Sequence, residues 1–205
     1  GSTIVIIGAS YAASWPVDSI SGHRIINRGL GGNQSFEMAA RFGRDVLSEK
    51  PSKVIIWGFI NDIFRSDPSE IDHARTRILT SYEELIDAAI ANGTEVILAT
   101  EVTIREPAGF VNWLSNIVGS VLGRTSYQDM INGHVLDVND QLMQIALSHN
   151  IMVLDFQSRL SDPDGKRMSE FAIADGSHLS VQAYDELTAY TLTQINAEDS
   201  ALEVK

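Results

Sequence analysis

The alternation of short apolar runs with longer amphipathic stretches constrains the fold of this 205-residue chain more than any other feature. Five apolar runs are predicted to be strands, and apolar residues recur at helical spacing in the stretches that separate or follow them. Strands that alternate with helices are typical of a parallel sheet covered by helices on both faces. We therefore expect a flavodoxin-like three-layer α/β/α sandwich with a five-stranded parallel sheet in the order 2-1-3-4-5. The predicted strands are residues 3–7, 24–27, 54–57, 96–99 and 151–154, and the predicted helices are residues 35–47, 67–92, 135–148 and 181–195.

The charge and apolar content of the chain argue against several classes of partner. Asp and Glu number 27 against 15 Lys and Arg, so the formal net charge is -12, and the basic residues are scattered. Such a surface repels phosphate backbones, which argues against nucleic acids and against anionic membrane surfaces. No apolar run approaches the roughly 18 residues of a membrane span, so no integral membrane segment is expected. The chain has no cysteine and opens with no leader pattern, and neither observation assigns a compartment.

One segment, residues 106–133, does not belong to the minimal alternating pattern. We expect it to be an insertion in the single domain formed by residues 1–205. Its apolar side chains, among them Phe110, Trp113 and Ile117, recur at helical spacing. As a helix near a binding site, this segment would be a lid or an acyl-binding wall. The alternatives are a helix that buries the same apolar side on the domain core, and a dimer contact.

The tetrapeptide from Asp175 to His178 places a carboxylate and an imidazole three residues apart, just before the last predicted helix. A chain can turn within such a segment so that the carboxylate holds one ring nitrogen and leaves the other free to accept a proton. In that interpretation His178 is a general base and Asp175 orients it. The alternative is a solvated loop in which Asp175 bonds backbone donors and Ser180 caps the last helix.

A serine lies near the opposite end of the chain, where the first predicted strand turns towards a helix. The hydroxyl of Ser10 becomes a nucleophile when an adjacent base removes its proton. Gly32 and Asn61 also follow predicted strands, and together with the N–H of Ser10 they offer three donors to an oxyanion. Ligands of such sheets bind at the carboxyl ends of the strands, so we expect these residues to meet there. Each position taken alone also fits a simpler interpretation, as a turn, a cap or a mobile glycine loop.

Four ordered blocks, taken together, resemble the SGNH (GDSL-type) hydrolase family over nearly the whole chain. The blocks are GASY at 8–11, NRGLGGN at 27–33, NDI at 61–63 and DGSHLS at 175–180. The resemblance implies a catalytic triad in which Ser10 is the nucleophile, His178 the base and Asp175 the third member. It also implies an oxyanion hole formed by Ser10, Gly32 and Asn61, and hydrolysis of esters or thioesters without a metal or cofactor.

The sequence departs from this family pattern at three positions. Ala9 stands where the family usually has aspartate before the nucleophile, and Asn33 replaces the usual aspartate of the second block. We expect these two changes to alter loop support, because neither position belongs to the triad. Phe59 stands where glycine usually lies two residues before Asn61, and we expect it to narrow the pocket or to shift that asparagine. Together with the apolar residues of the insertion, this position gives a predicted substrate pocket of Phe59, Phe110, Trp113 and Ile117.

These features predict a serine-dependent hydrolase that acts on a small-molecule ester or acyl substrate through an acyl-enzyme. One alternative is an acyltransferase with the same triad, in which a sugar or another alcohol replaces water. A second alternative is a non-catalytic flavodoxin-like module that binds an anion at the turn after the first strand. The four other histidines are dispersed without metal-ligand spacing, so neither a metal nor a cofactor is expected.

Overall fold

A six-stranded mixed sheet forms the centre of the computed structural model, which describes residues 2–105 and 124–203. The strand order is β2-β3-β1-β4-β5-β6. Neighbouring strands run parallel except β2, which pairs antiparallel with β3. The strands are β1 (Thr3–Gly8), β2 (Ser19–Ile20), β3 (His23–Gly29), β4 (Lys53–Trp57), β5 (Glu95–Ala99) and β6 (Met152–Leu154).

The prediction of a purely parallel five-stranded sheet is wrong at one edge of the sheet. The five predicted parallel strands are present in the predicted order, and β2 adds an antiparallel sixth strand beside β3. This edge strand has two residues and joins β3 through Ser21 and Gly22, both with positive φ. A run of two residues carries no detectable alternation of apolar and polar side chains, so the sequence pattern could not predict it.

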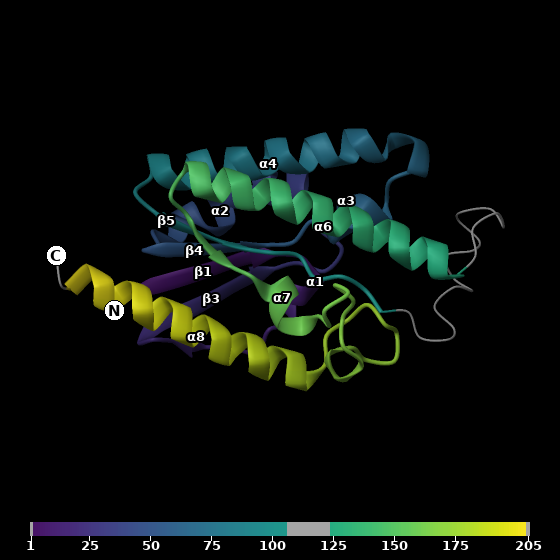
Figure 1. Ribbon diagram of the computed structural model, residues 1–205. Coiled ribbons are helices and arrows are strands. Elements are labelled where there is room, and N and C mark those ends of the chain that lie inside the picture. Colours follow the sequence, from purple (N-terminus) through teal and green to yellow (C-terminus); the bar gives the residue numbers. More distant parts are fainter. Residues whose placement is uncertain (1, 106–123, 204–205) are drawn as a thin grey trace.

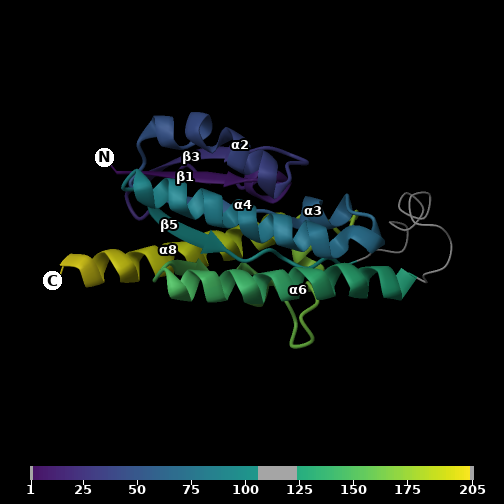
Figure 2. The same ribbon diagram turned by 90° about the horizontal axis from the view of Figure 1, so that it is seen from above.

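Helices cover both faces of the sheet (Figure 1). Figure 1 shows α2, α4 and α6 on one side of the sheet and α8 on the other, and Figure 2 shows from above that α4 and α6 run side by side. No helix in the described part of the chain is long and apolar enough to cross a lipid bilayer. The helices are α1 (Ser10–Ala13), α2 (Ser35–Asp45), α3 (Ile60–Phe64), α4 (Ile71–Ala91), α6 (Arg124–Ser148), α7 (Phe156–Leu160) and α8 (Val181–Glu203).

The beginnings of two helices bear on the sequence predictions. Asp67 caps the single 3-10 turn Pro68–Glu70 that leads into α4, and its carboxylate accepts a hydrogen bond from the Ser69 N–H at 2.9 Å. The helix α6 begins at Arg124, so the last part of the predicted insertion 106–133 is helical. Its apolar residues Phe110, Trp113 and Ile117 lie outside the described residues.

The two central strands of the sheet, β1 and β4, lie in the core of the molecule. The apolar residues of β1 and β4 are fully buried, as continuous apolar runs are in parallel sheets covered on both faces. In the register of the sheet, Gly8 at the end of β1 pairs with Gly29 of β3 on one side and with Trp57 of β4 on the other. The carboxyl ends of three neighbouring strands therefore lie side by side, and the loops that follow them meet at one edge.

Candidate active site

Ser10 is the first residue of α1 and follows directly after the end of β1. The turn between them is tight because Gly8 has no side chain. A Cβ atom on Gly8 would lie 2.1 Å from the carbonyl oxygen of Trp57 and 2.6 Å from the Cβ of Ala12. The Ser10 side chain is half-buried and lines a pocket at the carboxyl edge of the sheet.

Asp175 and His178 form a hydrogen-bonded pair in the loop before α8. The Oδ2 atom of Asp175 bonds Nδ1 of the imidazole, while Oδ1 accepts the N–H groups of Ser177 at 2.9 Å and of His178 at 2.8 Å. Partial burial disfavours the charged carboxylate, but these hydrogen bonds outweigh it and hold the pKa of Asp175 below its ordinary value. An ionised carboxylate can only accept, so Nδ1 carries the proton and Nε2 is left as the basic nitrogen.

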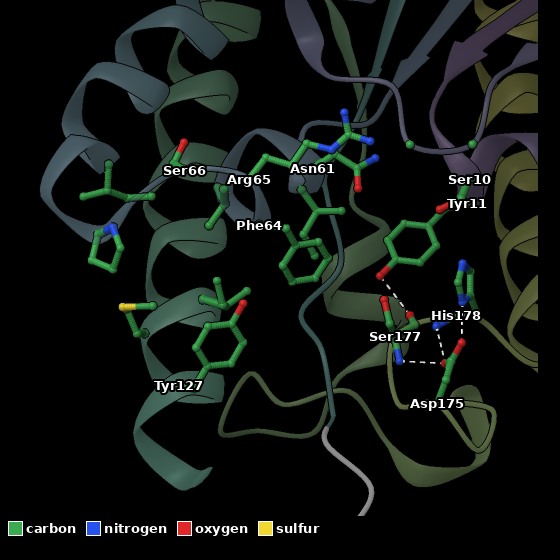
Figure 3. Close-up of a pocket in the computed structure, with 18 of the residues that line it drawn as sticks. Ser10, Tyr11, Asn61, Phe64, Arg65, Ser66, Tyr127, Asp175, Ser177 and His178 are labelled. Atoms are coloured by element: carbon green, nitrogen blue, oxygen red, sulfur yellow. Dashed lines mark hydrogen bonds and ion pairs between the residues drawn. The ribbon is translucent and has the colours of Figure 1, made fainter. Parts of the chain in front are cut away.

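The side chains of Ser10 and His178 lie on the same wall of the pocket. Figure 3 shows the imidazole between Ser10 and Asp175, with the carboxylate on the side remote from the serine. In the part of the chain that the structure describes, no hydrogen bond joins Ser10 to His178. Catalytic hydrogen bonds are often long without substrate and tighten when it binds. A side-chain movement is therefore needed to bring the two residues into hydrogen-bond contact.

Two buried side chains hold the carbonyl groups of the histidine loop. Arg167 is fully buried, and its guanidinium donates to the carbonyl oxygens of Ser177 and His178, the latter at 3.3 Å. It also donates to the Tyr11 hydroxyl at 3.0 Å, and that hydroxyl donates to the Ser177 carbonyl at 2.8 Å. Because Tyr11 directly follows Ser10, this network links the serine turn to the loop that carries the imidazole.

Gly32 and Asn61 line the same pocket as Ser10. Gly32 has a φ of +78°, a backbone conformation that residues with a side chain rarely adopt. The Nδ2 atom of Asn61 donates to the Asn33 carbonyl at 2.9 Å, which orients the amide beside the loop that carries Gly32. An amide nitrogen has two hydrogens, so its second N–H is left for another acceptor.

A buried glutamate fixes the start of α3, the short helix that carries Asn61. One oxygen of the Glu101 carboxylate accepts the N–H groups of Phe59 at 2.8 Å and of Ile60 at 3.0 Å. Burial raises the pKa of Glu101, and the N–H donors together with the charge of Arg167 oppose that rise. Glu101 therefore holds the turn that leads to Asn61, while Arg167 holds the loop that carries His178.

Phe59 lies in the core and is absent from the residues that line the pocket. Its side chain is fully buried beside Tyr82, with ring centroids 6.3 Å apart. The close approach of backbone to backbone at this turn occurs one residue earlier, at Gly58, where a Cβ would lie 2.9 Å from the Ala9 nitrogen. Because the glycine that this close approach requires stands at position 58, position 59 can hold a phenylalanine.

A buried arginine supports the loop that carries Gly32. Arg41 is 7% exposed and donates to the Asn33 side-chain oxygen at 2.7 Å, so the amide that replaces the usual aspartate still accepts a hydrogen bond. The same guanidinium donates to the carbonyl oxygens of Gly8 at 3.0 Å and Arg28 at 2.7 Å. Arg41 therefore joins this loop to the ends of β1 and β3.

The pocket extends from these polar residues into an apolar region. Its cavity volume is about 760 Å³, a size that suits a small-molecule ligand. Figure 3 shows Phe64 and Tyr127 on the side away from Ser10. The apolar part is lined by Ile60, Ile63, Phe64, Pro68, Ile71, Met130 and Ile131.

The structure brings five sequence-predicted residues together in this pocket: Ser10, Gly32, Asn61, Asp175 and His178. The sequence analysis missed Tyr11 and Arg65, which line the pocket, and the buried supports Glu101 and Arg167. Only Tyr11 carried a signal, since it belongs to the first sequence block. In residues 2–105 and 124–203, no group of three or more His, Asp and Glu side chains is placed to hold a metal ion.

The sequence matches the GDSL-like Lipase/Acylhydrolase family over residues 8–186. The fold and the match define the class of protein as the lipases, acylhydrolases and esterases of SGNH type. This chain belongs to the GDSL-like Lipase/Acylhydrolase family. None of the curated proteins matches it.

Solved structures share the fold along most of their length. A GDSL-like lipase from Bacteroides thetaiotaomicron has a TM-score of 0.74 at 18% identity, covering 96% of this chain and 88% of its own. The lipase/acylhydrolase from Enterococcus faecalis has a TM-score of 0.67 at 22% identity, covering 97% of both chains. A variant of an acetyl xylan esterase from Geobacillus stearothermophilus has a TM-score of 0.70 at 20% identity, covering 95% of this chain and 94% of its own. At these identities the likeness supports the fold alone.

Proposed function

We propose that the chain is a serine esterase that hydrolyses carboxylic esters through an acyl-enzyme, with Ser10, His178 and Asp175 as its catalytic triad. The observation that carries the proposal is the Asp175–His178 pair, whose free ring nitrogen serves the pocket that Ser10 lines. The lowered pKa of Asp175 supports its role, because an ionised carboxylate stabilises the imidazolium that forms during attack.

The reaction proceeds in two steps with balanced proton transfers. In the first, Ser10 Oγ attacks the carbonyl carbon while His178 Nε2 takes the hydroxyl proton, and the carbonyl electron pair moves onto oxygen. The C–O bond to the alcohol then breaks, and the imidazolium returns the proton to the leaving oxygen. In the second step, water attacks the acyl-enzyme while His178 Nε2 takes its proton. The bond between the acyl carbon and Ser10 Oγ then breaks, and the imidazolium returns the proton to Oγ, which releases the acid and restores Ser10.

The negative oxygen of each tetrahedral intermediate needs donors that are in place before the reaction. We assign this role to the N–H groups of Ser10 and Gly32 and to the second N–H of the Asn61 amide. Two contacts support the assignment: Glu101 accepts the Phe59 N–H two residues before Asn61, and Arg41 donates to the Asn33 side chain next to Gly32. Removal of one such donor typically slows kcat by about 10²- to 10³-fold.

The exposure of His178 favours hydrolysis over acyl transfer. The His178 side chain is 48% exposed, so water has access to the imidazole that activates water for attack on the acyl-enzyme. The apolar part of the pocket favours an acyl or alcohol group larger than acetate, because each buried methylene contributes about 0.8 kcal/mol. In a p-nitrophenyl ester series from acetate to palmitate, kcat/KM is expected to rise beyond acetate. A preference for acetate would contradict this use of the pocket.

Hydrolysis of p-nitrophenyl esters by wild type and by Ser10→Ala tests the proposal. We expect turnover by wild type and a loss of at least about 10³-fold in Ser10→Ala. Ser66→Ala is the matched control: this serine also lines the pocket, but its hydroxyl donates to the Asp62 carbonyl at 2.6 Å, and its loss should spare turnover. Equal rates in wild type and Ser10→Ala would reject Ser10 as nucleophile.

A further inference from the structure

Arg65 is a cation that lines the pocket and has no anionic partner among the residues that the structure describes. It follows α3 directly and lines the pocket beside the predicted oxyanion donors. Its Nη2 atom lies so close to Gly32 that a Cβ on the glycine would be 2.9 Å away. Figure 3 shows its side chain beside Asn61, between the catalytic end of the pocket and Ser66. In the described part of the chain, the guanidinium makes no ion pair or hydrogen bond.

This lack of a partner is notable in a chain with 27 acidic and 15 basic side chains. The two carboxylates that line the pocket are engaged elsewhere: Asp67 accepts the N–H and hydroxyl of Ser69, and Asp175 holds His178. Arg65 is the only Lys or Arg among the described residues of the pocket lining. Ion pairs with carboxylates engage Arg28, Arg41, Arg44, Lys53, Arg75, Arg77 and Arg159.

The backbone that carries Arg65 is held by buried groups. The fully buried Asp62 carboxylate accepts the N–H of Ser35 at 2.7 Å and its hydroxyl at 2.8 Å, which joins α3 to the start of α2. The Arg65 N–H donates to the Asn61 carbonyl at 3.0 Å. Arg65 itself is exposed, and these contacts fix its attachment point relative to the predicted oxyanion donors.

We propose that Arg65 is the anion-recognition residue of the site, and that the preferred substrate is an ester carrying a carboxylate or a phosphate within its reach. This inference rests on the proposed esterase function. A guanidinium binds either group through paired hydrogen bonds. Because the net charge of -12 repels anions in general, a local cation is required for such a substrate to bind.

A different role for the same cation would be direct stabilisation of the oxyanion. That role would lower kcat for every ester when Arg65 is removed, whatever the charge of the ester. Recognition of a substituent would instead act on one class of ester. The two roles therefore predict different kinetics for charged and neutral substrates of equal shape.

The test compares anionic esters with neutral isosteres in wild type, Arg65→Ala and Arg24→Ala. The acyl-side pair is 4-nitrophenyl hydrogen adipate and 4-nitrophenyl adipamate. The alcohol-side set is 4-acetoxybenzoate, 4-acetoxyphenyl phosphate and the neutral 4-acetoxybenzamide. Arg24 is the matched control because it is also an exposed arginine. It lies opposite Thr3 in the register of β3 and β1, at the end of the sheet remote from the pocket.

We expect wild type to favour at least one anionic ester over its isostere by roughly 10- to 100-fold in kcat/KM. Arg65→Ala should lose that preference through a higher KM for the anionic ester, with the neutral ester unchanged, and Arg24→Ala should retain it. The substrate set that shows the preference tells whether the anionic group belongs to the acyl side or to the alcohol side of the ester. Within the alcohol-side set, the preferred ester tells whether that group is a carboxylate or a phosphate. Equal values for charged and neutral esters in wild type, or an equal loss of kcat on both in Arg65→Ala, would overturn the proposal.

Binding without turnover separates this inference from the proposed esterase function. Ser10→Ala and Ser10→Ala/Arg65→Ala are titrated calorimetrically with the same esters. Weaker binding of the anionic ester alone in the double variant supports anion recognition, even if wild type hydrolyses none of the esters. Equal affinities in the two variants would reject it, even if wild type is an active esterase.

Discussion

Replacing Arg167 with methionine removes the buried cation that holds the histidine loop, while an apolar chain of similar length fills its place. The guanidinium is fully buried and donates to three oxygens, those of Ser177, His178 and Tyr11. The substitution leaves these acceptors short of a donor and leaves the buried Glu101 without the nearby positive charge that lowers its pKa. Breaking such a buried charged network costs about 3–5 kcal/mol of unfolding free energy.

That loss is a large part of the total, since domains unfold with about 5–15 kcal/mol. The variant should therefore fold at low temperature but melt early. Its kcat should fall by about 10²-fold, the effect of displacing a catalytic group by about 1 Å. Arg167→Lys should not restore it, because one ammonium cannot reach three acceptors as the planar guanidinium does.

Urea unfolding and ester kinetics, both measured well below the melting temperature, check this prediction. The control is Arg159→Met, which breaks a half-exposed pair with Glu186 and should cost less than about 1 kcal/mol with kcat unchanged. A loss below about 1 kcal/mol in Arg167→Met, or a kcat within twofold of wild type, would refute the positioning role. Retention of full kcat by Arg167→Lys would show that charge alone is sufficient.

Three further predictions address the triad, the oxyanion hole and acid stability. Asp175→Asn should lower kcat by about 10³- to 10⁴-fold in steady-state kinetics, since an amide facing Nδ1 favours the wrong tautomer, and a smaller loss would argue against the triad. Gly32→Ala should lower kcat with little change in KM, because its φ of +78° strains any side chain and the new Cβ would meet the Arg65 guanidinium; unchanged kcat would remove Gly32 from the oxyanion hole. The hydrogen bond from Arg44, together with Arg41, lowers the pKa of Asp45 to about 2. The ionised Asp45 carboxylate therefore stabilises the folded state at pH values above its ordinary pKa of 3.8, and this stabilisation is lost as the pH falls towards 2. Between pH 3.8 and 2, the melting temperature of Asp45→Asn should fall less steeply than that of wild type.

Local patterns were sufficient to predict the central architecture. The buried strands β1, β4 and β5 have continuous apolar runs, and the cap at Asp67 is encoded within four residues. Ser10, Gly32 and Asn61 could be placed at one edge because each follows a strand of a parallel sheet. The two-residue strand β2 could not be predicted in this way, because its pairing depends on the neighbouring strand.

The buried residues that hold the site, Glu101 and Arg167, could not be predicted from local sequence patterns for the same reason. Glu101 contacts the turn at Phe59 across 42 positions of sequence, and Arg167 contacts Tyr11 across 156. Neither residue carries a spacing that marks it, since an isolated charge in a sequence is usually solvated. Phe59 was predicted to line the substrate pocket, but its ring fills the core, since the adjacent Gly58 makes the close backbone contact.

The most direct test of the proposed triad is to locate the residue that a fluorophosphonate labels covalently. Intact-mass and peptide mass spectrometry of the treated protein should show one adduct, on the peptide that contains Ser10. The adduct should be absent from Ser10→Ala and should form far more slowly in His178→Ala, because the serine needs the base to react. An adduct on another residue, or labelling of Ser10 at an equal rate without His178, would contradict the proposed triad.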